Sequence, residues 1–492
     1  MTDTPRVVLF RHAPVDIDSR VKKFAITLQR AGYEPVVISV EPLGGTAGEF
    51  VLGDGIRVIR VPLQNAPQKT VRLRRDNLEA RRALHRRRAA YRERVRGADA
   101  ASAKAGAKWA LTTAKVAALK AASVASEASF RIQRAVAHRA SLRDPFVAAA
   151  VERNLPVVSD VTHTLTDLLV ELKPDVLHAH HPQVLLATRE ALKQLRAQGV
   201  DVKFYYDARE NFAGIPAKEQ GNQAAHQALL ACEAAMIGEA DAVSTVSEPI
   251  AEVLQKNNHL GDKPSVFLNM PPLGELTGPT TVREAAGLGD DVPLVVYSGT
   301  MSWARGIEAM VEGIKHMPED AHLVVVSVPL PHPMIPKLEL LAQQHGVAER
   351  LHFVGPVSQN ELLHYLSGAD VAIHPLPGGS PNHDAAMPNK LFEYLHAGLP
   401  LVVSDAKLMA KFVSQQGVGR VFTSEDPESL GKAVTSALAE PPSQRVAEVA
   451  AAYSWQGQEG RIVELYNSIT GYDGRTPRVD EPFGSLEVRP AP

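Results

Sequence analysis

The chain has 492 residues, of which 45% are hydrophobic and 22% charged, and its formal net charge is −2. This length exceeds one ordinary hydrophobic core, so two large domains are expected, and no apolar run approaches the roughly 20 residues of a membrane-spanning helix. Cys232 is the only cysteine, which excludes an internal disulfide and a thiolate metal site and predicts a cytoplasmic protein. The opening residues, MTDTPRVVLF, lack the features of a secretory signal.

Strands and helices alternate in the first part of the chain. The apolar run at 6–10 predicts a buried strand, apolar residues at helical spacing predict a helix from Ser19 to Gly32, and 34–42 predicts the next strand. After an interruption the same alternation continues from about residue 165 to 255. This rhythm is typical of a parallel α/β sheet, because parallel strands are joined by crossover helices.

A basic, alanine-rich stretch at 66–150 interrupts this pattern and reads as a helical insertion of two long helices joined near Gly97. Residues 69–143 carry 20 Lys and Arg against 5 Asp and Glu, whereas the rest of the chain carries 33 basic and 50 acidic residues. A solvated hairpin that packs on its own domain is one interpretation. An anionic membrane surface and a polyanionic acceptor are others, and we favour the membrane, which would place the protein at its inner face. No nucleic-acid recognition motif is present, so nucleic acid is not expected as a partner.

A linker rich in Pro, Gly and Thr at 269–292 precedes a second series of alternating strands and helices. We therefore expect an N-terminal Rossmann-like domain at 1–270 that contains the insertion and a C-terminal one at 271–450. The remaining residues predict a helix at 451–470 that packs back toward the N-terminal domain and a flexible tail at 471–492.

Ligands of open parallel sheets bind beyond the carboxyl ends of the strands, so the residues that follow each strand are the candidates for chemistry. After the strand at 293–299, Gly299 and Thr300 allow close approach of a ligand to the backbone, and Arg305 suits a diphosphate. A turn at 355–357 offers backbone groups to a nucleobase, with an ordinary loop as the alternative.

The stretch MPNKLFEYLHAGLP, residues 387–400, predicts a short helix with two different faces. Pro388 suits the first helical position, Gly398 ends the helix, and Leu391 belongs to a buried apolar stripe. Lys390 and Glu393 share the other face near the positive end of the helix. Lys390 would meet phosphate and Glu393 a ribose diol, although such a pair is also common as a solvated salt bridge.

These motifs together resemble the retaining glycosyltransferases of family 4. The likeness covers about residues 6–64 and 155–470 and rests on MPNKLFEYLHAGLPLVVSD, YSGTMSWARGIEAMVEGI and SQQGVGRVFTSEDPESLGKAV in the second half and on KPDVLHAHHP and ADAVSTVSEPIAEVLQ in the first. It implies the GT-B architecture, two Rossmann-like domains facing a cleft, with the donor sugar nucleotide on the second domain. The donor-binding residues implied are Gly299, Thr300, Val357, Asn389, Leu391 and Glu393, with Arg305, Lys390 and His180 as catalytic residues.

The chain departs from the family at Ala385, where an acidic residue that contacts the donor sugar is common. Asn382 and Asp384 are the nearby substitutes. In the first half, His178 and His180 end a strand; a metal cluster there is less favoured than a polar strand end, and His178 is the alternative to His180 beside the sugar. The strand end YYDAREN carries the candidate acceptor-site residues Asp207 and Glu210.

The predicted activity is transfer of a sugar from a UDP- or GDP-sugar to a saccharide, lipid-linked or cell-envelope acceptor. The resemblance implies no cofactor and no metal, because cationic side chains neutralise the leaving diphosphate. No residue stands out as a nucleophile, which favours attack on the same face of the sugar that the diphosphate leaves. A non-catalytic binding subunit and, less favoured, a nucleotide-sugar epimerase remain as alternatives.

Overall fold

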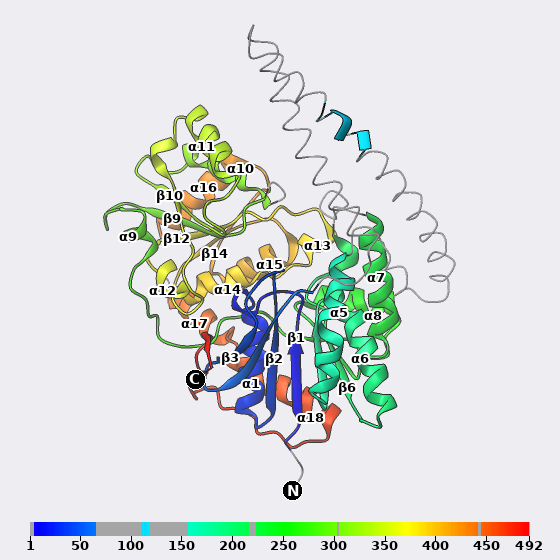
Figure 1. Ribbon diagram of the computed structural model, residues 1–492. Helices are drawn as coiled ribbons and strands as arrows, with labels where there is room; N and C mark the ends of the chain where they lie inside the picture. The colour runs from blue at the N-terminus through cyan, green and yellow to red at the C-terminus, as the bar shows by residue number, and fades with distance from the viewer. Residues whose placement is uncertain are drawn as a thin grey trace.

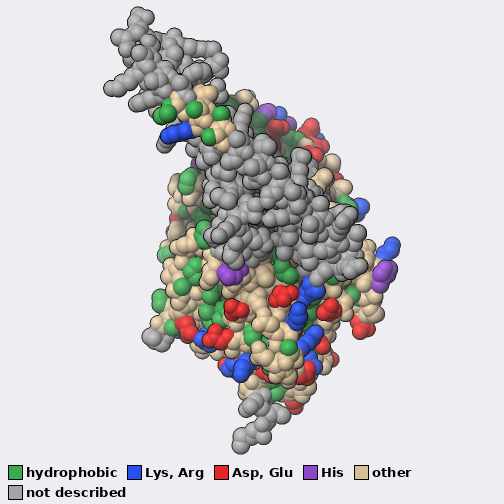
Figure 2. Space-filling view, turned by 45° about the vertical axis from the view of Figure 1, so that its right-hand side comes forward, with side chains coloured by type: hydrophobic (Ala, Val, Ile, Leu, Met, Phe, Trp, Pro, Cys, Tyr) green, Lys and Arg blue, Asp and Glu red, His purple; other side chains and the backbone are tan. Residues whose placement is uncertain are grey.

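The computed structural model describes residues 4–64, 111, 113–115, 117–118, 156–215, 223–302, 305–440 and 444–491. The predicted basic insertion at 66–150 lies outside these residues, apart from the few around Leu111, which are helical. None of the described helices is long and apolar enough to cross a membrane. On the described surface that faces forward in Figure 2, Lys and Arg side chains alternate with Asp and Glu rather than forming a patch of one sign.

The N-terminal domain is built on a sheet of nine strands whose centre is parallel. In sheet order the strands are β15 (Val488–Pro490), β3 (Gly48–Leu52), β4 (Ile56–Pro62), β2 (Glu34–Glu41), β1 (Arg6–Phe10), β5 (Val176–His180), β6 (Lys203–Asp207), β7 (Ala242–Thr245) and β8 (Ser265–Val266). Only β3 and β15 run antiparallel to their neighbours. The central strands are almost continuous runs of buried apolar residues, as strands covered on both faces require.

Helices cover both faces of this sheet (Figure 1). One face packs against α5 (Pro156–Glu171), α6 (Leu185–Ala197), α7 (Gln223–Ile237) and α8 (Glu248–Asn258). The other packs against α1 (Ser19–Arg30) and α18 (Gln456–Thr470), which belongs to the end of the chain. Trp455 precedes α18 and donates from Nε1 to Thr27 Oγ1 of α1 over 2.9 Å, which joins the two helices.

The C-terminal domain has a parallel sheet of six strands. Their order is β11 (Leu351–Val354), β10 (His322–Ser327), β9 (Leu294–Gly299), β12 (Val371–His374), β13 (Leu401–Ser404) and β14 (Gly419–Phe422). Its first face packs against α12 (Leu362–Leu366), α14 (Asn389–His396), α15 (Lys407–Gln416) and α17 (Gln444–Ala452). The second packs against α10 (Ile307–Gly313), α11 (Ile335–Gln344) and α16 (Pro427–Leu438). Two short helices remain: α9 (Val282–Ala285), whose Val282 joins the core of the first face, and α13 (Pro381–Asp384).

The chain passes between the domains twice. It leaves the N-terminal domain after β8 and reaches α9 through an irregular segment, and it returns between α17 and α18. We predicted a flexible tail at 471–492, but the structure gives this segment fixed partners: β15 pairs with β3 through Val488↔Leu52 and Pro490↔Phe50. The prediction was based on composition, which does not show that the edge of a distant sheet is open to another strand.

Candidate functional site

The first turn of α14 presents three polar side chains, as the sequence predicts. The helix begins at Asn389, after Pro388, and its apolar residues Leu391 and Phe392 are fully buried. Glu393 accepts from Lys390 Nζ at 2.6 Å and from Asn389 Nδ2 at 2.9 Å, so both oxygens of the carboxylate are engaged. The Leu391 side chain lies in the core, so a contact with the donor would have to come from its backbone, and the donor-binding role of Leu391 stays a prediction.

The end of β9 lies against this turn. Tyr394 of α14 accepts at its hydroxyl from the buried Ser298 N–H over 2.8 Å, and Lys390 Nζ lies 3.5 Å from Ser298 Oγ. Gly299 has φ +149°, and a Cβ there would lie 3.8 Å from Lys390 Cε. The predicted residues Gly299 and Lys390 therefore meet, although they are distant in sequence. Thr300 follows them and uses its carbonyl to accept from the Tyr297 hydroxyl.

A cavity of about 700 Å³ lies between the two domains, and we call it the interdomain cavity. It is at the carboxyl ends of both sheets, where parallel sheets bind ligands. The C-terminal domain contributes Ser302, Arg305, Leu376, Asn382, His383, Ala386, Met387, Pro388 and Asn389. The N-terminal domain contributes Arg11, Arg20, His181, Arg209, Glu210, Ile215, Val246, Ile250 and Asn269.

This cavity is lined by cations, as a site for an anionic group requires. Arg305 is exposed and, in the part of the chain that the structure describes, pairs with no carboxylate. On the facing wall Arg11 and Arg209 both bind Asp18, which is buried. Burial disfavours the ionised Asp18, but Arg209 and then Arg11 outweigh it and hold its pKa far below the usual range. Sequence reasoning did not name Arg11 or Asp18 as site residues, because the pairing of Asp18 with Arg209 joins residues that are far apart in the sequence.

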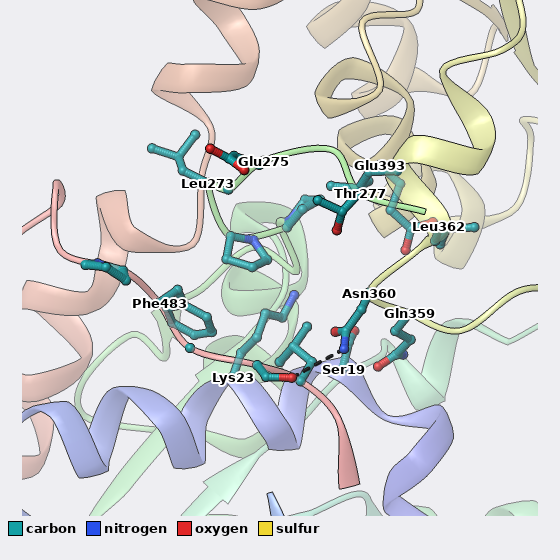
Figure 3. A pocket seen from close by; sticks show the side chains of 18 of the residues that line it. Ser19, Lys23, Leu273, Glu275, Thr277, Gln359, Asn360, Leu362, Glu393 and Phe483 are labelled. Atoms are coloured by element: carbon teal, nitrogen blue, oxygen red, sulfur yellow. Dashed lines mark hydrogen bonds between the residues drawn. The ribbon is translucent and has the colours of Figure 1, made fainter. Parts of the chain in front are cut away.

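A second cavity of about 440 Å³, which we call the side pocket, is lined by Glu393 and by residues from four other parts of the chain. Lys23 of α1 reaches into it, as Figure 3 shows, and donates to Asn269 Oδ1 at 2.8 Å. Burial lowers the pKa of Lys23 well below its usual value. Asn269 lines both cavities. On α14, Asn389 lines the interdomain cavity and Glu393 lines the side pocket, and a hydrogen bond joins these two residues. The two spaces therefore adjoin at α14.

The turn predicted to read a nucleobase lies beside the side pocket. Val357 is packed against the hydrophobic core of the C-terminal domain and does not line the pocket. Gln359, Asn360 and Leu362, the next residues along the same loop, do line it. That this loop reads a nucleobase stays a prediction, and Val357 is not among the loop residues that line the pocket.

Ala385, where the family commonly has an acid, is only 7% exposed and packs in the hydrophobic core of the N-terminal domain. Its carbonyl accepts from Ser247 Oγ at 2.7 Å, so the loop before α14 is fastened to the facing domain. A carboxylate in this position would be buried among apolar side chains. Of the two predicted substitutes, Asn382 lines the interdomain cavity, whereas Asp384 pairs with Lys407 at 2.9 Å.

The two predicted histidines of β5 do not reach the interdomain cavity. His178 and His180 have no exposed surface, and both Nε2 atoms lack a hydrogen-bond partner among the described residues. His178 Nδ1 contacts the Tyr466 hydroxyl at 2.6 Å, and His180 Nδ1 contacts Asp207 at 2.9 Å. Our prediction placed His180 beside a donor sugar. The structure instead brings the next residue, His181, to the cavity.

His181 reaches the cavity because the chain turns sharply at the end of β5. Its φ of +89° takes it out of the alternating pattern of the strand. Its ring packs at 4.5 Å from that of His12. Burial, and then the charges of His12 and Arg11, lower the pKa of His181 well below its usual value. A neutral imidazole can exchange hydrogen bonds with a hydroxyl group of a ligand.

Asp207, a predicted acceptor-site residue, is also buried. Arg20 binds both of its oxygens, at 2.7 and 2.8 Å, and Ser244 donates to it at 2.7 Å. Burial opposes ionisation, but Arg20 and His180 outweigh it and keep the pKa of Asp207 well below its usual range. His178, His180 and Asp207 have the spacing of metal ligands, yet this carboxylate is already occupied by Arg20 and Ser244. Glu210 is the predicted residue of this motif that lines the cavity.

Comparison with known proteins agrees with this geometry. Residues 280–454, which carry Arg305, Lys390 and Glu393, match the family model of the glycosyl transferases group 1. The C-terminal domain is therefore similar to the group 1 glycosyl transferases. The chain is also 26% identical over 207 residues to the D-inositol 3-phosphate glycosyltransferase of Xylanimonas cellulosilytica, covering 41% of this chain and 48% of that protein. The enzyme of the same name from Geodermatophilus obscurus is 25% identical over 257 residues, covering 48% and 55%.

The chain thus spans about half the length of the curated glycosyl transferases it matches. Solved structures share the whole fold. A sucrose-phosphate synthase from Thermosynechococcus elongatus has a TM-score of 0.62 at 16% identity, covering 95% of this chain and 99% of that one. Anabaena HepE in complex with UDP has a TM-score of 0.53 at 12% identity, covering 94% and 100%. The predicted GT-B architecture is confirmed.

Proposed function

We propose that this protein is a retaining glycosyltransferase of family 4 that transfers a sugar from a UDP- or GDP-sugar to a saccharide, lipid-linked or cell-envelope acceptor. One observation carries the proposal: α14 lies where two cavities adjoin, with several arginines lining one and Glu393 lining the other. A sugar nucleotide has this division, since its diphosphate separates the sugar from the nucleoside. Anabaena HepE, which has the same fold, was solved with UDP.

The diphosphate would lie between Arg305 and Lys390, next to the N–H groups at the start of α14. Lys390 Nζ pairs with Glu393 at 2.6 Å, which places its charge beside the proposed site. As the bond between the sugar and the phosphate oxygen breaks, negative charge grows on the diphosphate, and these cations stabilise it most in the transition state. This is the reason to propose that no metal ion is required.

The acceptor would enter from the N-terminal domain, where Arg209, Glu210 and His181 line the interdomain cavity. We propose that the acceptor hydroxyl attacks the sugar on the face from which the diphosphate departs. The new bond joins that oxygen to the anomeric carbon, and its proton passes to the departing phosphate oxygen. Trapping of a covalent sugar adduct on Glu210, the one carboxylate among the described residues that line this cavity, would contradict this mechanism.

The test is release of nucleoside diphosphate from a panel of UDP-, GDP- and ADP-sugars. Release with at least one donor, with or without acceptor, is expected of a transferase, because such enzymes also hydrolyse donors slowly. A changed sugar without release would mark an epimerase. Binding without either reaction would mark a non-catalytic subunit. Arg305→Glu should abolish both binding and release; unchanged binding of every donor by this variant, once shown to be folded, would refute the proposal.

A further inference from the structure

The last residues of the chain are fixed to the N-terminal domain. The Gly53 N–H donates to the carbonyl of Glu487 at 3.1 Å, directly before β15 pairs with β3. Glu481 pairs with Arg475 at 2.8 Å, and Arg30 approaches it at 3.6 Å. A Cβ on Gly53 would lie only 2.7 Å from the carbonyl oxygen of Ser485, so the two backbones are in close contact. The segment between Glu481 and Glu487 is thus held at both ends.

Between these anchors, residues 482–486 form one wall of the side pocket. Ser485 Oγ accepts from Asn360 Nδ2 of the C-terminal domain at 3.3 Å, a contact drawn as a dashed line in Figure 3. Phe483 lies beside Lys23 in the same view, and its side chain is 4% exposed. The opposite wall is the loop of Gln359 and Leu362. A segment from the N-terminal domain and a loop from the C-terminal domain therefore enclose one space.

The proposed role of Glu393 indicates which part of the donor would occupy this space. If Glu393 binds the ribose and Arg305 binds the diphosphate, the base must extend from the ribose away from the phosphates. The side pocket lies in that direction, because it contains Glu393 but none of the cavity's arginines. Its walls combine apolar side chains, such as Leu273 and Leu362, with the amides of Gln359 and Asn360. Apolar walls with a few polar groups suit a planar heterocycle.

We propose that residues 482–486 form one wall of the donor's nucleobase site and determine which base it accepts. The inference rests on the proposed function, since it takes the ligand to be a sugar nucleotide. According to this inference, the two Rossmann-like cores alone do not form the whole donor site, and residues 482–486 complete it. Base selection then depends on the space between residues 482–486 and the loop of Gln359 and Leu362, because a purine is larger than a pyrimidine.

The test compares the binding of UDP, GDP and inorganic pyrophosphate to the full-length protein by calorimetry. In Ser485→Trp, an indole directed toward Asn360 fills the side pocket. This variant should bind UDP and GDP about tenfold more weakly or worse, and its affinity for pyrophosphate should not change. Val479→Trp is the matched control: Val479 lies in the same terminal segment, is 52% exposed and does not line the pocket, so it should change none of the three.

A second variant tests selection and does not depend on the first one folding. Leu486→Ala widens the same wall and should change the ratio of the UDP and GDP dissociation constants by about tenfold, the range of one or two methylene groups in an apolar pocket. Unchanged nucleotide affinity in Ser485→Trp, or an unchanged ratio in Leu486→Ala, would overturn the inference. If the inference is overturned in this way but Arg305→Glu still abolishes nucleotide binding, the proposed function stands. If the wild-type protein binds neither UDP nor GDP, the proposed function itself is wrong.

Discussion

At the scale of single residues, Glu393 has the most specific role. Its two oxygens already accept from Asn389 and Lys390, so the carboxylate is held in one orientation before any ligand arrives. A preorganised carboxylate can accept from both hydroxyl groups of a ribose without losing side-chain entropy at that moment. A nucleotide that lacks one ribose hydroxyl can therefore distinguish ribose binding by Glu393 from a general effect of its negative charge.

Glu393→Ala should weaken UDP binding about 10- to 100-fold, the equivalent of one or two charge-assisted hydrogen bonds. The decisive comparison is with 2′-deoxy-UDP, measured by calorimetry. The wild-type protein should bind it more weakly than UDP, whereas the variant should bind the two alike. If the variant still prefers UDP, Glu393 does not hold the ribose.

His374, at the end of β12, is buried, and neither of its ring nitrogens has a partner among the described residues. Burial, followed by the charges of Arg305 and Lys390, lowers its pKa to about 3. An unfolded chain binds the proton near pH 6.5, so the folded state loses stability as the pH falls from 6.5 toward 3. The loss is about 1.4 kcal/mol for each pH unit in that window.

The His374→Leu variant should not show this pH dependence. Its free energy of unfolding, measured with urea, should fall less between pH 7 and pH 5 than that of the wild-type protein. His163→Leu, which changes an exposed histidine of α5, is the control and should keep the wild-type pH dependence. An equal pH dependence in the wild type and His374→Leu would show that His374 is not held neutral in the folded state.

At the scale of elements, the turn before α10 sets the position of Arg305. Gly306 has φ +70°, and a Cβ on it would lie 2.4 Å from the carbonyl oxygen of Pro375. Gly306→Ala should therefore lower the free energy of unfolding by about 2–4 kcal/mol, from backbone strain and the clash together, and weaken nucleotide binding through Arg305.

Gly287→Ala provides a matched control for this variant. Gly287 has a φ of +69°, but nothing lies within 4 Å of a Cβ there. The Gly287→Ala variant should therefore lose only about 1 kcal/mol of unfolding free energy, which is the cost of the left-handed conformation, and its nucleotide affinity should not change. Equal losses in the two alanine variants, by urea unfolding, would mean that the contact with Pro375 does not constrain the turn.

The elements also show what the sequence could and could not predict. Buried parallel strands and the two faces of α14 follow from local periodicity, and both were predicted. Which histidine reaches the cavity does not follow. Alternation puts His178 and His180 on one face, but α18, from the far end of the chain, covers that face through Tyr466. Likewise, the place of β15 depends on a sheet edge formed more than 400 residues earlier.

At the scale of the whole molecule, the distinctive feature is the basic segment 69–143, of which the structure describes only a few helical residues around Leu111. We propose that it binds an anionic membrane surface, as would suit an enzyme with a lipid-linked acceptor. The protein should sediment with vesicles that contain phosphatidylglycerol and not with pure phosphatidylcholine, and about 0.5 M salt should release it.

Arg86, Arg87 and Arg88 provide the variant for this test. Each basic side chain near the surface contributes about 1 kcal/mol, so replacing the three by Gln should weaken binding by about a hundredfold. Replacing Arg189, Arg196 and Lys203 by Gln removes the same charge from the N-terminal domain outside the segment and should have little effect. Binding that ignores lipid charge and salt would contradict the proposal.

The path of the chain has a consequence for its synthesis. The N-terminal domain starts with β1 but needs α18 and β15, whereas every strand of the second sheet lies between residues 294 and 422. The ribosome thus emits a complete C-terminal domain while its neighbour still lacks a covering helix and an edge strand. Although translation usually lets the leading domain fold first, here that domain is completed only after all strands of the second sheet have been synthesised.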